Sequence, residues 1–399
     1  MGSATASNAK HFALRSIAPA AVLIVLMLLF VAGAIVTLHH KDNTSIRGVL
    51  VNDQATMPRP RKILRVEEEP AKEPSNNGCT NQRLPSGSEP LPRGIVHETT
   101  NLEMETSLGG DPEHRKKQQE ATPAPKSKSI LAIPVGIKNK AVVDRLVSKF
   151  PATDFAVMLF HYDGAVEQWG DLEWSGRAVH VAARGQTKWW FAKRFLHPDV
   201  VAEYEYVFLW DEDIEVDAFD PVRYLDVVRR EGLEVSQPAL DRRSEIHHAI
   251  TARALAPTED GVHRRVLGTR CDGDSTGPPC AGWVEVMVPV FSRAAWRCAW
   301  HMAQNDLIHG WGLDYMLGYC AQGDRTRNVG VVDSEYVLHR GVPMLGDRDK
   351  ATPSAGRAAV RWRSFKEMQI FNRRWEEAAA EDKSWTDPYA AQPPTASSR

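Results

Sequence analysis

The 399-residue chain lacks aromatic residues over a long internal stretch. No Phe, Trp or Tyr occurs from His39 to Ser129, although 30 of the 32 aromatic residues lie at Phe150 or later, and this stretch holds 10 of the 25 prolines. A segment with no rings to bury gains too little from folding to offset the entropy of ordering it. We therefore expect a flexible, Pro-rich stem over residues 39–129, a folded domain over 130–378 and a loose polar tail over 379–399.

The sequence also lacks a strong excess of charge of either sign and several common catalytic motifs. A formal net charge of −2 gives no electrostatic reason to expect a nucleic acid as partner. There is no GxxxxGK[ST] phosphate loop, no HExxH zinc motif and no GxGxxG after a predicted strand. These absences argue against a P-loop nucleotide hydrolase, a zinc peptidase and a dinucleotide-dependent dehydrogenase.

The five cysteines show no paired metal-ligand spacing, so zinc bound by cysteine is not expected. Cys271 and Cys280 flank a loop rich in Gly and Pro, which suits a disulfide. Cys298 and Cys320 form either a second disulfide or two free buried thiols.

One segment near the N-terminus lacks charged residues altogether. Residues 17–38 are 22 almost uniformly apolar residues, enough for a helix to cross the hydrocarbon core of a bilayer. We expect an uncleaved signal-anchor here, with residues 1–16 as a cytosolic tail and the rest of the chain in the secretory lumen. The alternative is a cleaved signal peptide, because Ala32-Gly33-Ala34 fits the small-x-small cleavage pattern.

From Ile130 onward, short apolar segments alternate with helical patterns. Near-continuous apolar strands between helices predict an α/β fold with a mostly parallel central sheet that is flanked by helices. Strands are expected at residues 130–135, 155–160, 178–182, 204–210, 235–240 and 283–291, with a closing strand or loop at 329–339. Helices are expected at residues 140–150, 188–196, 292–302 and 312–321, and after Asp220-Pro221 as far as Gly232.

Asp211 and Asp213 follow the predicted strand at 204–210. Open α/β sheets bind ligands beyond the carboxyl ends of their strands. Side chains two apart in an extended chain point the same way, so the two carboxylates can share one cation, and such hard oxygen ligands suit Mg²⁺ or Mn²⁺. The alternative interpretation is an acidic turn after a strand.

Four other residues are candidates for chemistry. Asp314 follows a tight Gly-Trp-Gly turn and is expected to start a helix, where it acts either as an N-terminal cap or as a general base toward an acceptor hydroxyl. His339, at a strand end, can fill an open cation position as neutral imidazole. Arg184 and Lys188 precede the acidic strand and can hold phosphate charge.

The segments WDEDIEVDAFDP (210–221) and HGWGLDY (309–315) resemble a plant family labelled lysine-ketoglutarate reductase trans-splicing related proteins, over residues 130–375. At longer range the order of motifs is similar to that of GT-A glycosyltransferases. This resemblance implies a Rossmann-related GT-A-like fold, with Asp314 as the catalytic base. The implied ligands of Mn²⁺ or Mg²⁺ are Asp211, Asp213 and His339. The implied nucleotide-sugar site comprises Arg184, Lys188, Asp211, Gly282, Trp283 and Trp311.

A short cytosolic tail, one anchor, a Pro-rich stem and a lumenal domain also look like Golgi glycosyltransferases. The expected function is therefore a Golgi type II membrane glycosyltransferase that moves a sugar from a nucleotide-sugar donor to a glycan or other hydroxyl acceptor. One departure is that Leu313 precedes Asp314, where the usual base motif has Glu-Asp. The alternative is a non-catalytic, membrane-anchored binding or scaffold protein on a degenerate transferase fold.

Overall fold

The structure is a computed structural model. It describes residues 84–97, 128–245, 248–256, 258, 260–268, 270–341 and 353–389. All of these lie in one of the chain's two units, Cys79–Arg399. The expected cytosolic tail and signal-anchor, residues 1–38, lie outside the described residues. Among the residues that are described, no helix has the length and apolar character needed to cross a membrane.

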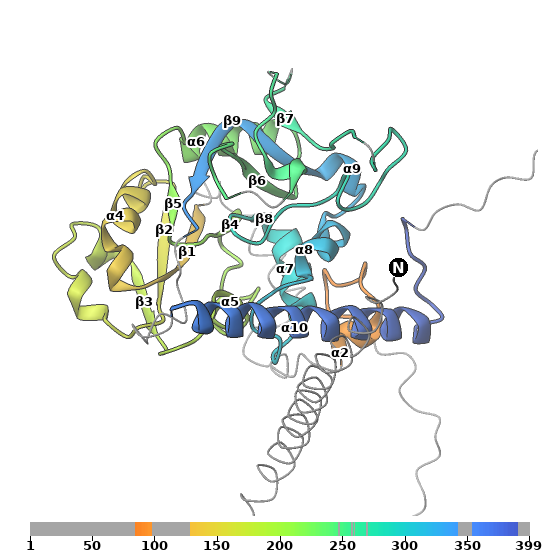
Figure 1. The fold of residues 1–399 in the computed structure, drawn as a ribbon, viewed down its shortest axis with the longest axis horizontal. Helices are drawn as coiled ribbons and strands as arrows, with labels where there is room; N and C mark the ends of the chain where they lie inside the picture. The colour runs from red at the N-terminus through yellow and green to blue at the C-terminus, as the bar shows by residue number, and fades with distance from the viewer. Residues whose placement is uncertain are drawn as a thin grey trace, which may run out of the picture. The chain divides into compact units, whose positions relative to one another are not determined.

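Within the described residues, nine strands form one sheet (Figure 1). The strands are β1 (Ser129–Val135), β2 (Phe155–His161), β3 (Val179–Ala182), β4 (Tyr206–Leu209), β5 (Ile214–Glu215), β6 (Val235–Leu240), β7 (Val262–His263), β8 (Val290–Ser292) and β9 (Val329–His339). Their order is β3-β2-β1-β4-β8-β6-β9-β5, with β7 also paired to β9. Every residue of β1 and β4 is buried, as expected for strands covered on both faces.

The sheet is mixed, which corrects the expectation of a mostly parallel one. β1, β2, β3 and β4 run parallel, and β6 runs parallel to β9, but β8 is antiparallel to both β4 and β6. The strand expected at residues 283–291 is reduced to Val290–Ser292. Pro289 has no backbone N–H and cannot continue a central ladder, although its carbonyl still accepts from the Leu209 amide at 3.2 Å.

Helices cover both faces of this sheet. They are α2 (Arg93–His97), α4 (Lys140–Ser148), α5 (Lys188–Phe195), α6 (Pro221–Arg230), α7 (Arg293–Met302), α8 (Leu313–Met316), α9 (Arg325–Asn328) and α10 (Pro353–Glu381). One hydrophobic cluster contains residues of α2, α5, α7 and α10, and the other contains residues of α4 and α6. Predicted caps are confirmed: Asp220 accepts from the first-turn amides of α6, and Ser292 accepts from the Ala295 amide of α7.

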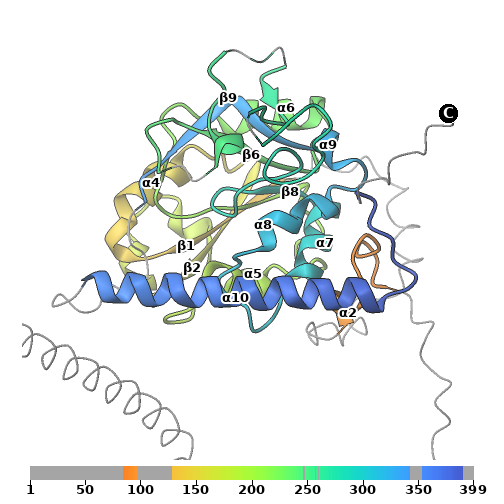
Figure 2. The ribbon, with the colours of Figure 1, turned by 45° about the vertical axis from the view of Figure 1, so that its right-hand side comes forward.

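The structure corrects three further expectations. The helix expected at 312–321 is divided into α8 and a 3-10 turn at Leu317–Cys320. Part of the expected stem is folded, because α2 packs beside the C-terminal half of α10 and buries Ile95 and Val96 without needing an aromatic ring of its own (Figures 1 and 2). The expected loose tail begins inside α10, and beyond it the Trp385 indole donates to the Pro90 carbonyl at 2.8 Å.

Both candidate disulfides are present. Cys271 is bonded to Cys280, as the Gly- and Pro-rich loop predicted. Cys298 of α7 is bonded to Cys320, which decides between the two alternatives left open by the sequence. The second bond ties α7 to the 3-10 turn that directly follows α8.

Candidate functional site

The carboxyl ends of β1 and β4 lie beside each other where the strand order changes direction. The chain passes from β1 outward through β2 and β3 and returns to the other side of β1 as β4. Ligands bind at such switch points in open α/β sheets. A cavity of about 280 Å³ lies here, lined by Pro134 of β1, Lys188 of α5, Asp211 after β4, Trp311 before α8 and Arg361 of α10, among others.

The acidic turn after β4 is anchored by its middle residue, Glu212. This side chain is fully buried and accepts hydrogen bonds from the Gly136 amide, at 2.7 Å, and from the Tyr162 hydroxyl. A Cβ at position 136 would lie 2.3 Å from the Tyr162 hydroxyl oxygen, so this approach requires glycine. Burial raises the pKa of Glu212 to about 7, although both hydrogen bonds oppose the rise. Glu212 therefore fixes the turn that carries Asp211 and Asp213 to the ends of β1 and β2.

Asp211 is paired with Lys188 at the cavity wall. Thr187 caps α5 by accepting from the Trp190 amide, which places Lys188 in the first turn of the helix. The Lys188 ammonium lies 2.6 Å from Asp211 Oδ1 and also donates to the Val286 carbonyl. Burial raises the pKa of Asp211, while the Lys188 charge lowers it. Lys188, which the sequence predicted to bind phosphate, therefore forms an ion pair with Asp211 in this structure.

Asp213 and His339, which are far apart in the sequence, are neighbours in the structure. The antiparallel pairing of β5 with β9 sets Ile214 opposite His339, and this brings His339 Nε2 to 3.3 Å from Asp213 Oδ2. The His339 amide donates to the Ser244 hydroxyl at 2.9 Å. Burial lowers the pKa of His339, but the hydrogen bond to Asp213 and its charge outweigh burial and raise that pKa above its ordinary value.

The three expected cation ligands are therefore only partly assembled. Asp213 and His339 offer a carboxylate oxygen and an imidazole nitrogen, ligands that suit Mn²⁺. Asp211 lies within electrostatic range of both but is held by Lys188. Across the described ranges, no group of three or more His, Cys, Asp or Glu side chains is arranged to hold a metal ion.

Asp314 lies in the first turn of α8, as predicted. Gly312 precedes the helix with φ +94°, a conformation that favours glycine, and the Asp314 carboxylate accepts from the Tyr315 amide at 3.2 Å. Burial raises the pKa of Asp314 to about 6. This contact reaches only the next residue, and α8 has Gly312 at its N-cap position with no side-chain cap hydrogen bond, so the structure does not show the capping role expected for Asp314. The raised pKa of Asp314 suits a general base near neutral pH.

Glu285 is a further acidic residue at this site that the motif search missed. It is 4% exposed, and burial followed by the charge of Asp314 raises its pKa to about 7. The only signal in the sequence is one acid inside the apolar segment GWVEVMVPV. Such an acid in a predicted buried strand is costly and can mark a functional group.

Aromatic residues neighbour these carboxylates along the chain. Trp283 is buried and stacks on Tyr315, with ring centroids 5.5 Å apart, and the His248 ring meets Trp283 edge-on at 4.0 Å. Tyr315 is 36% exposed and Trp311 is 41% exposed, so both present ring surface to solvent.

The six residues assigned to a nucleotide-sugar site do not all meet. Lys188, Asp211 and Trp311 line the cavity at the switch point, whereas Arg184, Gly282 and Trp283 are not among its lining residues. Arg184 packs over the loop after β2, against Gly164. Gly282 has φ +65° and faces Arg325, so it shapes the turn before Trp283.

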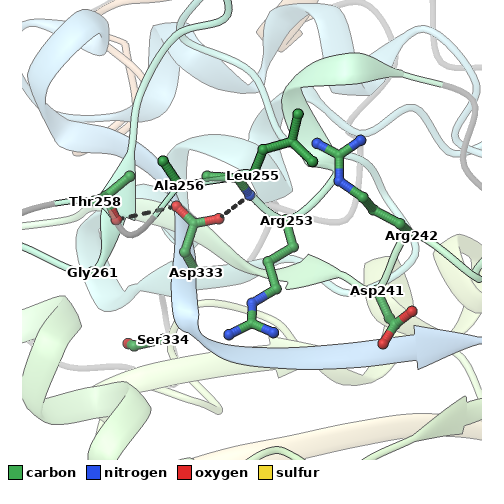
Figure 3. A pocket seen from close by; sticks show the side chains of 10 residues that line it. Asp241, Arg242, Arg253, Leu255, Ala256, Thr258, Gly261, Asp333 and Ser334 are labelled. Carbon is green, nitrogen blue, oxygen red and sulfur yellow. Dashed lines mark hydrogen bonds between the residues drawn. The ribbon is translucent and has the colours of Figure 1, made fainter.

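A larger cavity, of about 500 Å³, lies beside β9 (Figure 3). Its buried carboxylate, Asp333, accepts from the Ala254 amide at 2.8 Å and lies 2.7 Å from His263 Nδ1. The Arg253 guanidinium lies 3.8 Å from the centre of the Tyr336 ring. None of the residues predicted from the sequence lines this cavity, and its two acidic residues, Asp241 and Asp333, already have partners within the chain, so size alone does not make it the functional site.

A protein-family model described as "Protein of unknown function (DUF707)" matches residues 82–381. The chain belongs to the DUF707 family. The matched range includes α2 within the expected stem and ends at the last residue of α10. The family description does not include the lysine-ketoglutarate reductase label that the sequence resemblance suggested.

Comparison with solved structures gives distant likenesses. Residues 1–349 of S. aureus TarS match with a TM-score of 0.31 and 11% identity over 53% of this chain and 60% of that chain. The same protein in complex with UDP matches with a TM-score of 0.32 and 11% identity over 65% of this chain and 72% of that chain. The 4-diphosphocytidyl-2C-methyl-D-erythritolsynthase of Anaerococcus prevotii matches with a TM-score of 0.31 and 11% identity over 59% of this chain and 98% of that chain. No curated protein matches this sequence.

Proposed function

We propose that this DUF707 protein is a glycosyltransferase that moves a sugar from a nucleotide-sugar donor to a hydroxyl acceptor with the help of Mn²⁺ or Mg²⁺. The observation that carries the proposal is the meeting of Lys188, Asp211, Asp213 and His339 at the switch point of the sheet, beside a cavity. These residues come from three separate parts of the chain. At this edge of the sheet, a lysine ammonium can bind a diphosphate, and carboxylate and imidazole groups can bind its metal ion.

On the donor side, Lys188 would bind the diphosphate, and Trp311 would form part of the cavity wall around the donor. Asp213 and His339 would hold the divalent cation, which when bound neutralises negative charge on the leaving diphosphate. Glu212 keeps the acidic turn in place through the Gly136 amide. Each of these side chains is held by regular secondary structure or by a turn tied to it, which is what a site of fixed geometry requires.

On the acceptor side, Asp314 would act as the general base of an inverting reaction. The proton of the acceptor hydroxyl passes to the Asp314 carboxylate while the acceptor oxygen bonds to the anomeric carbon of the sugar. The bond from that carbon to the phosphate oxygen breaks, and its electron pair leaves with the nucleoside diphosphate. With a pKa of about 6, Asp314 is mostly ionised at neutral pH and is still basic enough to take a proton.

The proposal also places the enzyme in the Golgi lumen, as a type II membrane protein anchored by residues 17–38. The two disulfides support an oxidising compartment, because such bonds are rare in proteins of the cytosol.

The alternative, a non-catalytic scaffold, is favoured by one observation. The Lys188–Asp211 ion pair occupies a carboxylate that a metal-dependent transferase needs for its cation. A thermal shift with Mn²⁺ and UDP or GDP separates the two functions, because a ligand that binds only the folded state raises its stability. A transferase gains stability from metal and nucleotide together, and a scaffold does not respond.

Substitution of Asp213 gives the direct test of catalysis. Asp213→Ala should abolish sugar transfer while circular dichroism shows the wild-type fold. Asp217→Ala, which removes an exposed acid shortly after the same turn, is the matched control and should keep full activity. Full transfer activity in Asp213→Ala would contradict the proposed donor site.

A further inference from the structure

The cavity beside β9 has two acidic side chains, and the first of them is already saturated by the chain (Figure 3). The Asp241 carboxylate accepts from the Arg243 guanidinium through both oxygens, each at 2.9 Å, and from the Arg243 amide at 2.8 Å. The hydrogen bond from the Arg243 side chain, followed by that from its amide, lowers the pKa of Asp241. Asp241 is therefore ionised at neutral pH, and its charge is neutralised by a cation that is bonded directly to it.

The second acid, Asp333, is paired with a histidine that must be charged. Its Oδ2 lies 2.7 Å from His263 Nδ1, and His263 Nε2 lies 2.6 Å from the Ile250 carbonyl oxygen. A carboxylate and a carbonyl both accept, so both ring nitrogens donate and the His263 ring carries a positive charge. The Ala254 amide donates to Asp333 Oδ1 at 2.8 Å, and the Thr258 hydroxyl donates to Oδ2 at 3.3 Å. Asp333 is thus also neutralised and hydrogen-bonded within the chain.

Two arginines at the same cavity have no such partner. Arg242 and Arg253 both line it and are open to solvent, and neither guanidinium makes a hydrogen bond or a salt bridge with a described residue. The charge of Arg253 acts on Asp241 only at longer range. The Arg253 guanidinium lies 3.8 Å from the centre of the Tyr336 ring, a contact that holds it in place while its N–H groups stay free to bind an oxyanion. The cavity therefore offers positive charge that no acid of the described chain neutralises.

The position and size of the cavity suit a small organic ligand. Asp241 directly follows β6, and β6 points the same way as β4 because both are antiparallel to β8. The cavity thus adjoins the sheet edge where α/β folds bind ligands. Its volume of about 500 Å³ is within the range of small-molecule sites. The described residues that line it include none of those that line the donor cavity at the switch point, so the two sites are separate.

We propose that this cavity binds a sugar-sized organic anion, with Arg253 as the first contact of its carboxylate or phosphate group and Arg242 as the second. The guanidinium N–H groups donate to the oxygens of the ligand, an arrangement for which the planar arginine fork is well matched, and no covalent bond is made or broken. The rest of the ligand would cover Leu255, a wall residue that is 86% exposed. The inference goes beyond the proposed function, because it concerns a second binding site.

Isothermal titration calorimetry of the full-length protein with glucuronate, glucose 6-phosphate, glucose and inorganic phosphate tests the charge requirement. We expect at least one of the two anionic sugars to bind, and glucose, which has the same ring without the charge, to give no measurable heat. The tighter of the two anionic sugars identifies the group that is recognised. Its binding should weaken as the salt concentration rises, because exposed charges are screened. Inorganic phosphate should bind more weakly than the better anionic sugar, because it leaves most of the cavity empty.

Substitution of Arg253 tests the residue. Arg253→Gln should raise the Kd of the anionic sugar about tenfold or more, because a hydrogen bond to a charged group is lost. Arg253→Lys keeps the charge but loses the planar fork, so its Kd should lie between those of wild type and Arg253→Gln. Arg145→Gln is the matched control, since Arg145 is an exposed arginine of α4 that does not line this cavity, and its Kd should equal that of wild type. Circular dichroism checks that all three variants are folded.

The contrary results are distinct from one another. Absence of binding by both anionic sugars, equal binding of glucose, or an unchanged Kd in Arg253→Gln would overturn the inference. Inorganic phosphate that binds as tightly as the better anionic sugar would show a site for an ion alone, which also contradicts it. Loss of Mn²⁺-dependent UDP or GDP binding in Arg253→Gln would show that the nucleotide occupies this cavity, and would overturn both the inference and the proposed donor site. Binding of an anionic sugar without any nucleotide binding would refute the proposed function and leave the inference standing.

Discussion

The substitution Glu285→Gln should stabilise the protein at neutral and alkaline pH. Burial raises the pKa of Glu285 from 4.5 to about 7. A pKa difference of one corresponds to about 1.4 kcal/mol, so the ionised carboxylate costs the folded state about 3 kcal/mol. The neutral amide of the variant has no charge to desolvate and so avoids this cost. Most substitutions of buried residues destabilise, which makes a stabilising one an informative result.

The sign of the pH dependence follows from the raised pKa. Below pH 4.5 the side chain is protonated in both the folded and unfolded states, and the carboxyl contributes no penalty. Between pH 4.5 and about 7 the folded state retains a proton that the unfolded state has released, so stability falls as pH rises. The advantage of Glu285→Gln over wild type should therefore be near zero at pH 4 and should reach its full value above about pH 7.

Urea denaturation at pH 4, 5.5 and 8 measures this difference directly, because the midpoint reports stability when the slope is unchanged. Glu335→Gln is the control, since Glu335 is hydrogen-bonded to the Asp220 amide and ion-paired with Arg223 at 3.0 Å. It should gain less stability at pH 8 than Glu285→Gln does, because these two contacts oppose the rise in the pKa of Glu335 that burial causes. A Glu285→Gln variant that is less stable than wild type at pH 8 would refute the reasoning, because it would show that the carboxylate makes favourable contacts within the chain.

Three other substitutions test separate parts of the account. Lys188→Met should weaken the binding of nucleoside diphosphates by roughly 10- to 100-fold in isothermal titration calorimetry, because a hydrogen bond to a charged group contributes about 1.5–3 kcal/mol; an unchanged Kd would remove Lys188 from the donor site. Asp213→Asn should lower the pKa of His339, because the charge and hydrogen bond that raise it are lost; NMR titration of the imidazole protons measures this, and a constant pKa would be the contrary result. Gly310→Ala should destabilise the fold by about 2–4 kcal/mol in urea denaturation, since Gly310 has φ +75° and a Cβ there would lie 2.2 Å from Trp189 Cδ1. Wild-type stability of this variant would show that the loop relaxes without cost.

Local signals in the sequence were enough to predict much of the sheet and its helices. Apolar strand segments and helix caps depend on residues that are close together in the sequence, which makes them predictable. The predictions of β1, β2 and α6 with its Asp220 cap are confirmed. The structure of 84–97 was not predictable in this way. Ile95 and Val96 are buried only because α10 and α7 lie against α2, contacts that depend on residues about 200 or more positions away.

The candidate site, too, could be predicted from the sequence only in part. Asp213 and His339 were selected from motif order, and the β5–β9 pairing brings them within 3.3 Å of each other. The pairing of Lys188 with Asp211 and the burial of Glu285 were not predicted, because both depend on how distant segments pack. A single acid in an apolar segment is not a motif. The burial of this carboxylate becomes visible only in the structure.

The central claim is a metal-dependent nucleotide site at the switch point of the sheet. Calorimetric titration of the full chain with UDP and with GDP, each with and without Mn²⁺, tests it most directly. The account predicts that one nucleotide binds in the presence of Mn²⁺, and that this binding disappears in Asp213→Ala and persists in Asp217→Ala. Absence of binding in every combination, or equal binding in Asp213→Ala, would contradict the account and favour a non-catalytic scaffold.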